Sequence, residues 1–313
     1  MVANMTVLNR RRFLMISAAA LLAGKPSLAD PLRQWRSRAL GAEVVIALAH
    51  PDGEGIARRV FAEIERLEQI FSLYRKESEL SRLNRDGSLR RPSFELLECL
   101  SLSAAVGAAT HGAFEPTVQP LWHYYAQAHE ADAEPDPDSL ERLRTLIGFQ
   151  WVAFGSEEVR YLKPGMAMTL NGIAQGLIAD KVAALLREEG LTNVFINTGE
   201  IQALGSSPQD GPQGWLVSLK AGEELLPGRV LLKDRALATS APLGTTFDGG
   251  GRLSHILDPR TGLPVKASRR LVSVSSRSAA IADALSTAGC LLEEIELTKA
   301  ISSVPGAKLE RIL

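Results

Sequence analysis

The sequence predicts an α+β fold for most of its 313 residues. Helix-like and strand-like segments follow one another irregularly, without the regular strand–helix–strand alternation that is typical of a parallel, doubly wound sheet. Hydrophobic residues make up 45% of the chain, which is enough for a sizeable core. The length fits one large domain or two modest ones, and we expect a single α+β domain over residues 30–313.

Five segments have the apolar spacing of helices. In the segment 93–111, Ser93 is suited to cap the N-terminus of the helix, and Gly112 follows its end. In the segment 174–189, the helical pattern is closed by Gly190. The predicted helices are 55–71, 93–111, 138–147, 174–189 and 278–292.

Short apolar and β-branched runs, bounded by turn residues, predict the strands. Two polar segments are expected to lack regular structure: 78–84 as a polar turn, and 112–122 as a loop whose path is fixed by two prolines. The predicted strands are 44–48, 151–154, 159–162, 193–197, 215–219, 230–232, 236–240 and 271–275.

The first 29 residues are predicted to be an export signal. An arginine run at 10–12 precedes an apolar stretch of about 11 residues at 13–23, which is well short of the roughly 20 that span a bilayer. Small residues at 27–29 suit signal peptidase, so the mature chain would begin at Asp30. The pattern is typical of a twin-arginine signal and predicts a periplasmic protein, with an ordinary secretory signal as the alternative. No Cys follows the stretch, so we expect no membrane anchor.

Charge and composition argue against a nucleic-acid partner. The chain has 35 basic and 36 acidic residues, and this balance gives no electrostatic footprint for nucleic acid. No Cys-x-x-Cys pair and no histidine cluster indicates zinc or haem. Cys99 and Cys290 lie in apolar helical contexts, and we expect two buried free thiols, although one bridge is the alternative.

Three polar segments in the first part of the chain are candidates for ligand binding. Tyr74 follows a predicted helix and could place its ring on a flat heterocycle, or it could belong to the core. The loop 112–122 is rigid enough for its backbone to read the edge of a ring, but it could also be purely structural. The segment 169–176 is a glycine turn that opens a helix, which lets the backbone approach phosphates. It lacks the spacing of a dinucleotide-binding fingerprint and the lysine of a P-loop, so a plain tight turn remains the alternative.

Two segments in the second part of the chain carry chemically active side chains. His255 precedes the strong turn signal at 258–262, and such a histidine is more often structural than catalytic. Asp283 and Thr287 are four residues apart on a predicted helix, so both side chains face the same way. One carboxylate and one hydroxyl make an oxygen-only partial site that suits Mg²⁺ when phosphates supply the remaining ligands. A buried, capping aspartate is the alternative.

In chain order, these segments resemble the ApbE family of FAD:protein FMN transferases over about residues 40–304. The resemblance is carried by "FSLYRKESELSRLN", "GAFEPTVQPLW", "NGIAQGLIAD", "ATSAPLGTTF", "SHILDPRTGLP" and "IADALSTAG". It implies a sheet-rich core, mixed or antiparallel, with packed helices and a smaller lobe, and a flavin cleft between the two. It also implies cleavage of FAD, attachment of FMN through a phosphoester to Thr or Ser of another protein, and release of AMP.

The resemblance also implies roles for individual residues. Asp283 and Thr287 would bind Mg²⁺ together with the carbonyl of Gly172. Because a hydroxyl is a poor nucleophile at neutral pH, a base must take its proton, and His255, with an ordinary pKa near 6.5, is our candidate. The residues expected to contact FAD are Leu40, Tyr74, Ala113, Phe114, Glu115, Thr169, Gln175, His255 and Leu257.

The chain departs from the family pattern mainly on the nucleotide side. Thr169 and Gln175 stand where Asp and Lys are usual, Asn171 replaces the first Gly of the turn, and Glu115 replaces an Asp. A later Gly-Gly-Asp segment is Thr-Gly-Glu at 198–200. These changes put FAD affinity and turnover in doubt, whereas Asp283, Thr287 and His255 match the family.

The export signal and the motifs "ATSAPLGT" and "SHILDPRTG" are similar to those of NosX-type members of the family. For these the expected acceptor is a NosR-type membrane flavoprotein of nitrous oxide respiration. Two other functions stay open: a flavin-binding carrier without transferase activity, which the substitutions at Thr169 and Gln175 would suit, and a FAD pyrophosphatase that forms AMP without an acceptor.

Overall fold

The computed structural model describes residues 31–39, 41–222, 224–248, 251–266 and 270–313. The predicted export signal over residues 1–29 and the predicted flavin contact Leu40 lie outside these residues.

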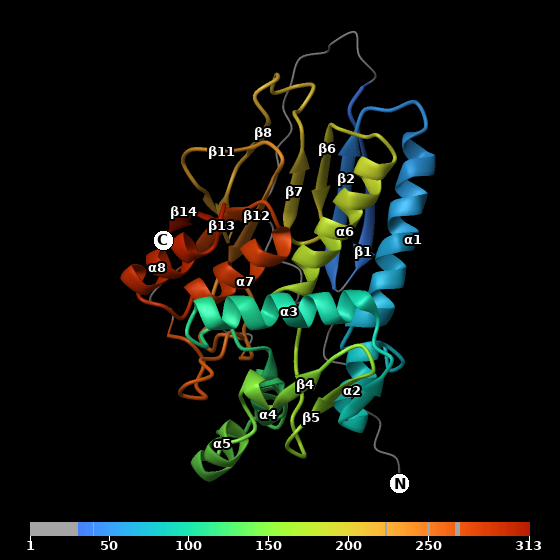
Figure 1. Cartoon of the computed structure of the whole chain (residues 1–313). Helices are drawn as coiled ribbons and strands as arrows, with labels where there is room; N and C mark the ends of the chain where they lie inside the picture. The colour runs from blue at the N-terminus through green and yellow to red at the C-terminus, as the bar shows by residue number, and fades with distance from the viewer. Residues whose placement is uncertain (1–30, 40, 223, 249–250, 267–269) are drawn as a thin grey trace.

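A seven-stranded sheet forms the centre of the fold (Figure 1). Every pair of neighbouring strands is antiparallel, so the α+β prediction is confirmed. In spatial order the strands are β1 (Arg33–Ala39), β2 (Ala42–Leu48), β6 (Val194–Asn197), β7 (Ile201–Leu204), β12 (Arg235–Ser240), β13 (Val272–Ser276) and β14 (Lys308–Ile312).

Side chains of the central strands alternate between two hydrophobic clusters, as a strand requires. In β6, Val194 and Ile196 join the larger cluster, whereas Phe195 faces the smaller one. The helices on the first face are α1 (Gly53–Phe71), α3 (Phe94–Ala109), α6 (Ala174–Glu188), α7 (Ala279–Gly289) and α8 (Glu294–Ser303). The second face is covered by the ribbon of β8 (Trp215–Val217) and β11 (Val230–Leu232), with β9 (Lys220–Ala221) and β10 (Glu224–Leu225) beside it.

The remaining elements form a smaller lobe below α3 in Figure 1. A three-stranded antiparallel sheet in the order β3-β5-β4 is part of this lobe. The elements are α2 (Glu79–Asp86), β3 (Ser88–Arg90), the 3-10 turn η1 (Pro116–Val118), α4 (Gln119–Glu130), α5 (Pro137–Arg144), the 3-10 turn η2 (Phe149–Trp151), β4 (Val152–Phe154) and β5 (Glu158–Tyr161).

Two predictions of irregular structure are wrong. The segment 78–84 is mostly helical, because the hydroxyl of Ser78 accepts a hydrogen bond from the Ser81 amide at 3.1 Å and caps α2. The second half of 112–122 enters α4, because Pro120 lies in the first turn, where a missing amide hydrogen costs nothing. Strand β1 was not predicted, since the sequence of Arg33–Ala39 is too polar to show strand alternation.

Helices α6 and α7 pack closely together beside the candidate site. A Cβ atom added to Gly176 of α6 would lie 2.3 Å from the Ala279 carbonyl oxygen of α7. The Asp180 carboxylate accepts hydrogen bonds from the Ala279 amide at 2.8 Å, the Ala280 amide at 3.1 Å and the Ser278 hydroxyl at 2.7 Å. These donors belong to the N-terminus of α7, whose amides lack partners within the helix. Helix α6 therefore fixes where α7 begins.

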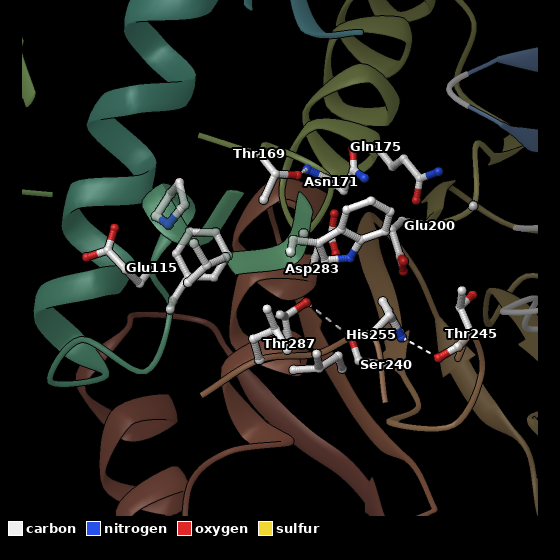
Figure 2. A pocket seen from close by; sticks show the side chains of 18 of the residues that line it. Glu115, Thr169, Asn171, Gln175, Glu200, Ser240, Thr245, His255, Asp283 and Thr287 are labelled. Atoms are coloured by element: carbon white, nitrogen blue, oxygen red, sulfur yellow. Dashed lines mark hydrogen bonds between the residues drawn. The ribbon is translucent and has the colours of Figure 1, made fainter. Parts of the chain in front are cut away.

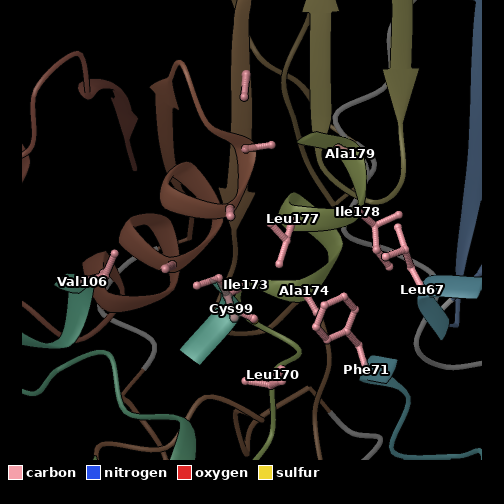
Figure 3. Close-up of a cluster of buried hydrophobic side chains, with 14 of the residues drawn as sticks. Leu67, Phe71, Cys99, Val106, Leu170, Ile173, Ala174, Leu177, Ile178 and Ala179 are labelled. Carbon is pink, nitrogen blue, oxygen red and sulfur yellow. The ribbon is translucent and has the colours of Figure 1, made fainter. Parts of the chain in front are cut away.

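Apolar side chains of α6 anchor the same helix in the core (Figure 3). Ala174 lies beside Phe71, Ile178 lies beside Leu67, and Leu177 points toward the opposite side of the cluster. Cys99 is part of this cluster, and both Cys99 and Cys290 are buried thiols that form no disulfide with each other, as predicted.

We predict that Gly176→Ala lowers the free energy of unfolding by about 1–3 kcal/mol or more, because the added methyl group must push two backbones apart. Urea unfolding followed by circular dichroism would measure this change. Gly155→Ala is the matched control, since a Cβ at Gly155 meets no atom within 4 Å. Equal stability of the two variants would contradict the importance of the contact.

Candidate functional site

A cavity lies where the two lobes meet, and most of the predicted site residues line it (Figure 2). Its walls come from the segment 113–118, the start of α6, the end of β12, the loop around His255 and one face of α7. The predicted residues that line it are Ala113, Phe114, Glu115, Thr169, Gly172, Gln175, His255, Leu257, Asp283 and Thr287. Tyr74 is not among the lining residues and is 59% exposed.

The three predicted metal ligands come together at one side of the cavity. Asp283 is 3% exposed, and one of its carboxylate oxygens accepts a long hydrogen bond of 3.4 Å from the Gly176 amide. A Cβ at Gly172 would lie 3.0 Å from the Thr287 hydroxyl oxygen, so the bare backbone of Gly172 lies against this side chain. Ser240 steadies the hydroxyl of Thr287 at 3.3 Å, and Ser286 lies 2.7 Å from Ser240 (Figure 2). The site therefore offers a carboxylate, a hydroxyl and an accessible backbone.

A second buried carboxylate, Glu200, was not predicted as a site residue. It lines the same cavity, is 6% exposed, and accepts a hydrogen bond from the Thr239 amide at 3.2 Å. Burial raises the pKa of Asp283 to about 8. Burial first, and the charge of Asp283 second, raise the pKa of Glu200 well above its ordinary value. In the sequence, Glu200 stands beside Gly199 and only marks a departure from the family pattern. The strand after it, β7, is not predicted, so its burial has no clear sequence signal.

Glu115 lines the cavity, but its carboxylate is engaged elsewhere. One oxygen accepts from the Thr117 amide at 3.0 Å and the Thr117 hydroxyl at 2.7 Å. The other accepts from the Phe149 amide at 2.9 Å. The side chain therefore caps η1 and ties the segment 113–118 to the smaller lobe.

Thr169 and Gln175 are neutral residues where the family pattern has Asp and Lys, and neighbouring groups fix both in place. The Thr169 amide donates to the Pro116 carbonyl at 2.8 Å, and its hydroxyl accepts from the Asn171 amide at 3.2 Å. A Cβ at Gly199 would lie 2.8 Å from the Gln175 side-chain oxygen. Gln175 thus lies over a glycine whose φ of +103° few other residues adopt.

His255 is placed as a proton acceptor. Its Nδ1 lies 2.8 Å from the Thr245 carbonyl oxygen. Because a carbonyl oxygen can only accept, Nδ1 carries the hydrogen, and the lone pair of the neutral ring is on Nε2. Burial lowers the pKa of His255 below its ordinary value, although the carbonyls of Thr245 and Pro242 partly oppose this. The ring is therefore neutral at physiological pH.

The charges of the cavity wall are one-sided. The lining residues include Glu43, Glu115, Glu200 and Asp283, and over the described part of the chain they include no Lys or Arg. An anionic ligand would therefore need a cation to accompany it. No group of three or more His, Cys, Asp or Glu residues within the described ranges could hold a metal alone. A cation here would depend on the hydroxyl of Thr287, the backbone of Gly172 and oxygens of the ligand.

Comparison with known proteins identifies the class of fold. The structure superposes on the flavin transferase ApbE from Vibrio cholerae with a TM-score of 0.76 and 26% sequence identity, covering 89% of this chain and 94% of that one. The ApbE protein from Thermotoga maritima gives a TM-score of 0.77 at 26% identity, over 90% and 96% of the two chains. Among relatives by sequence, a FAD:protein FMN transferase of Vibrio cholerae is 28% identical over 296 residues, 89% of this chain and 86% of the relative.

The family model for the ApbE family matches residues 40–309. The chain therefore belongs to the ApbE family, and the resemblance expected from its motifs is confirmed. Among the helices of the described residues, none combines the length and apolar character needed to cross a membrane.

We predict that His255 titrates below pH 6.5 and has its proton on Nδ1 when neutral. The physical reason is burial together with the hydrogen bond to Thr245. Long-range ¹H–¹⁵N correlation spectra of the histidine rings, recorded across a pH series and assigned with His255→Gln, would measure both properties. A midpoint above pH 6.5, or a proton on Nε2, would contradict the assignment of Nε2 as the accepting atom.

Proposed function

We propose that this chain is an exported, Mg²⁺-dependent FAD:protein FMN transferase. It cleaves FAD, attaches FMN through a phosphoester to a Thr or Ser of a periplasmic or membrane flavoprotein, and releases AMP. The observation that carries the proposal is the meeting of Asp283, Thr287, Gly172 and His255 in one cavity of an ApbE-family fold. The names of the relatives as FAD:protein FMN transferases support the reaction.

The cavity suits Mg²⁺ because its donors are oxygens and its wall is acidic. The Asp283 carboxylate, the Thr287 hydroxyl and the Gly172 carbonyl would hold the ion. When bound, Mg²⁺ supplies positive charge to the pyrophosphate and to the leaving AMP. Ser240 keeps the Thr287 hydroxyl in place, and Gly176 donates to Asp283, so the donor set is ordered by the protein itself.

His255 is the base in this mechanism. Its Nε2 takes the proton of the acceptor hydroxyl while that oxygen bonds to the phosphorus of the FMN half. The phosphorus–oxygen bond to AMP breaks in the same displacement, and AMP leaves with the electron pair. Thr245 holds the ring by its Nδ1 hydrogen and stabilises the imidazolium that forms.

The apolar part of the wall positions the flavin. Ala113 and Phe114 are buried in the larger hydrophobic cluster, and Leu257 is buried against Leu121 and Tyr125 of α4. Such walls exclude water, which favours transfer to a protein hydroxyl over hydrolysis. Much of the remaining barrier is alignment of the acceptor hydroxyl with the phosphorus.

The acceptor and the location are proposed from the sequence motifs alone. The twin-arginine pattern supports export to the periplasm, and the similarity to NosX-type proteins supports a NosR-type membrane flavoprotein as the acceptor. The neutral side chains of Thr169 and Gln175 would suit a flavin carrier, so the test must separate transfer from binding.

We predict that the mature protein, mixed with FAD, Mg²⁺ and the flavin domain of a NosR-type protein, adds one FMN to that domain. Intact mass of the domain and chromatography of AMP would measure the two products. EDTA abolishes both products, and Asp283→Asn lowers the rate at least about 100-fold, because the donor set loses its carboxylate. Asp138→Asn, an exposed carboxylate on α5, is the control and keeps full activity.

A binding measurement on the same variants separates loss of metal binding from loss of the transfer reaction. We expect Asp283→Asn to weaken Mn²⁺ binding, measured by electron paramagnetic resonance without flavin, while Asp138→Asn binds as the wild type does. AMP without labelling would favour the pyrophosphatase, and tight FAD binding without AMP would favour the carrier.

We predict that the transfer rate falls on the acid side with a midpoint below pH 6.5, because only neutral His255 accepts a proton and burial lowers its pKa. His255→Gln should lower kcat about 10²–10⁴-fold and remove this acid limb. Stopped-flow or single-turnover rates across pH 5 to 9 would measure it. An unchanged acid limb in His255→Gln would assign the base to another group.

A further inference from the structure

We propose that the outer edge of β1 is the docking site for the acceptor protein, which adds an acidic, extended segment to the sheet there. This inference rests on the proposed function, because it assumes that a protein hydroxyl must reach the cavity. Strand β1 lies at one edge of the sheet, and the described residues form ladder pairs with it only through β2. Within the described ranges, the other side of the strand pairs with no second strand, and extended segments of partner proteins pair with backbone groups of this kind.

The strand is exposed but firmly held. Five of its seven residues are exposed, and only Ala39 is buried. The half-buried Trp35 packs against α1, since a Cβ at Gly53 would lie 2.3 Å from its ring. A rigid edge loses little entropy when a partner strand is added.

The edge is continuous with the cavity. Strand β1 ends at Ala39, which pairs with Ala42 of β2, and both Ala42 and Glu43 line the cavity. A shallow hollow lined by Arg36, Ser37, Arg38 and Glu43 lies beside it and shares Glu43 with it. A segment that pairs along β1 is therefore led to the cavity at the Ala39 end of the strand.

The charge of the edge differs from that of the cavity. Arg33, Arg36 and Arg38 lie on this one strand, and only Arg36 has a carboxylate within ion-pair distance among the described residues, Glu43 at 2.9 Å. Arg33 and Arg38 point to opposite faces of the sheet, so each face of the edge carries an arginine with no carboxylate within ion-pair distance among the described residues. Electrostatic complementarity selects an acidic partner segment for this edge.

An extended segment also fits the reaction better than a helix. A strand needs about 4.8 Å of width beside its neighbour, whereas a helix with its side chains is about 10 Å wide. Alternate side chains of a strand point to opposite faces, so one Thr can turn toward the cavity while its neighbours stay outside.

The test uses the mature protein, FAD, Mg²⁺ and the flavin domain of a NosR-type protein as the probe. The double variant Arg33→Glu with Arg38→Glu reverses the free charges and leaves the Arg36–Glu43 pair intact. We expect the KM for the probe to rise about tenfold or more, while the KM for FAD and the affinity for Mn²⁺ stay unchanged. The double variant with Lys at both positions should behave as the wild type, and so should Arg58→Glu on the exposed side of α1.

The outcomes separate the docking site from the reaction. If the wild type labels the probe and the double Glu variant labels it with the same KM, the docking inference is wrong. If the Lys variant fails as the Glu variant does, charge is not what the edge contributes, and the inference is again overturned. If the wild type transfers no FMN to the probe, the proposed function fails as stated and the docking inference falls with it.

Discussion

The close contact between α6 and α7 decides where the three proposed metal ligands, Gly172, Asp283 and Thr287, can lie. Gly176 has no side chain to hold the helices apart. The Asp180 carboxylate of α6 accepts hydrogen bonds from the N-terminal amides of α7. Gly172 and Thr287 are far apart in sequence, yet a Cβ at Gly172 would lie only 3.0 Å from the Thr287 hydroxyl. Oxygen donors for a cation must be placed to within a fraction of an ångström, so this spacing is a functional constraint as much as a packing one.

The same arrangement places two carboxyl groups in a poorly solvated cavity. Asp283 and Glu200 are both nearly buried in one cavity, and each makes ionisation of the pair more costly. Residues that destabilise the folded state in this way persist when a ligand offsets the cost. A divalent cation is that ligand in the proposed reaction, and its binding would then stabilise the fold as well as the transition state.

Much of the core could be predicted from the sequence, because its helices are long and their apolar spacing is regular. The pairing of Asp283 with Thr287 was likewise readable, since four residues along a helix fix their common face. Glu200 could not be found in this way, because its burial is produced by strands and helices that are distant in sequence. Strand β1 and helix α2 were missed for a related reason: a polar edge strand and a short capped helix carry little apolar pattern.

The structure shows how the residues that depart from the family pattern are held in the cavity wall. Gln175 fills the space above Gly199, and Thr169 is fixed by Pro116, so both neutral residues are well-ordered parts of the wall. Neither can offer a positive charge to a pyrophosphate, and no Lys or Arg among the described lining residues replaces it. In the proposed reaction, attraction for the nucleotide would then come from a cation at Asp283 and from backbone amides. Under the proposed function, binding of the flavin nucleotide and binding of the metal would therefore be tightly coupled in this chain.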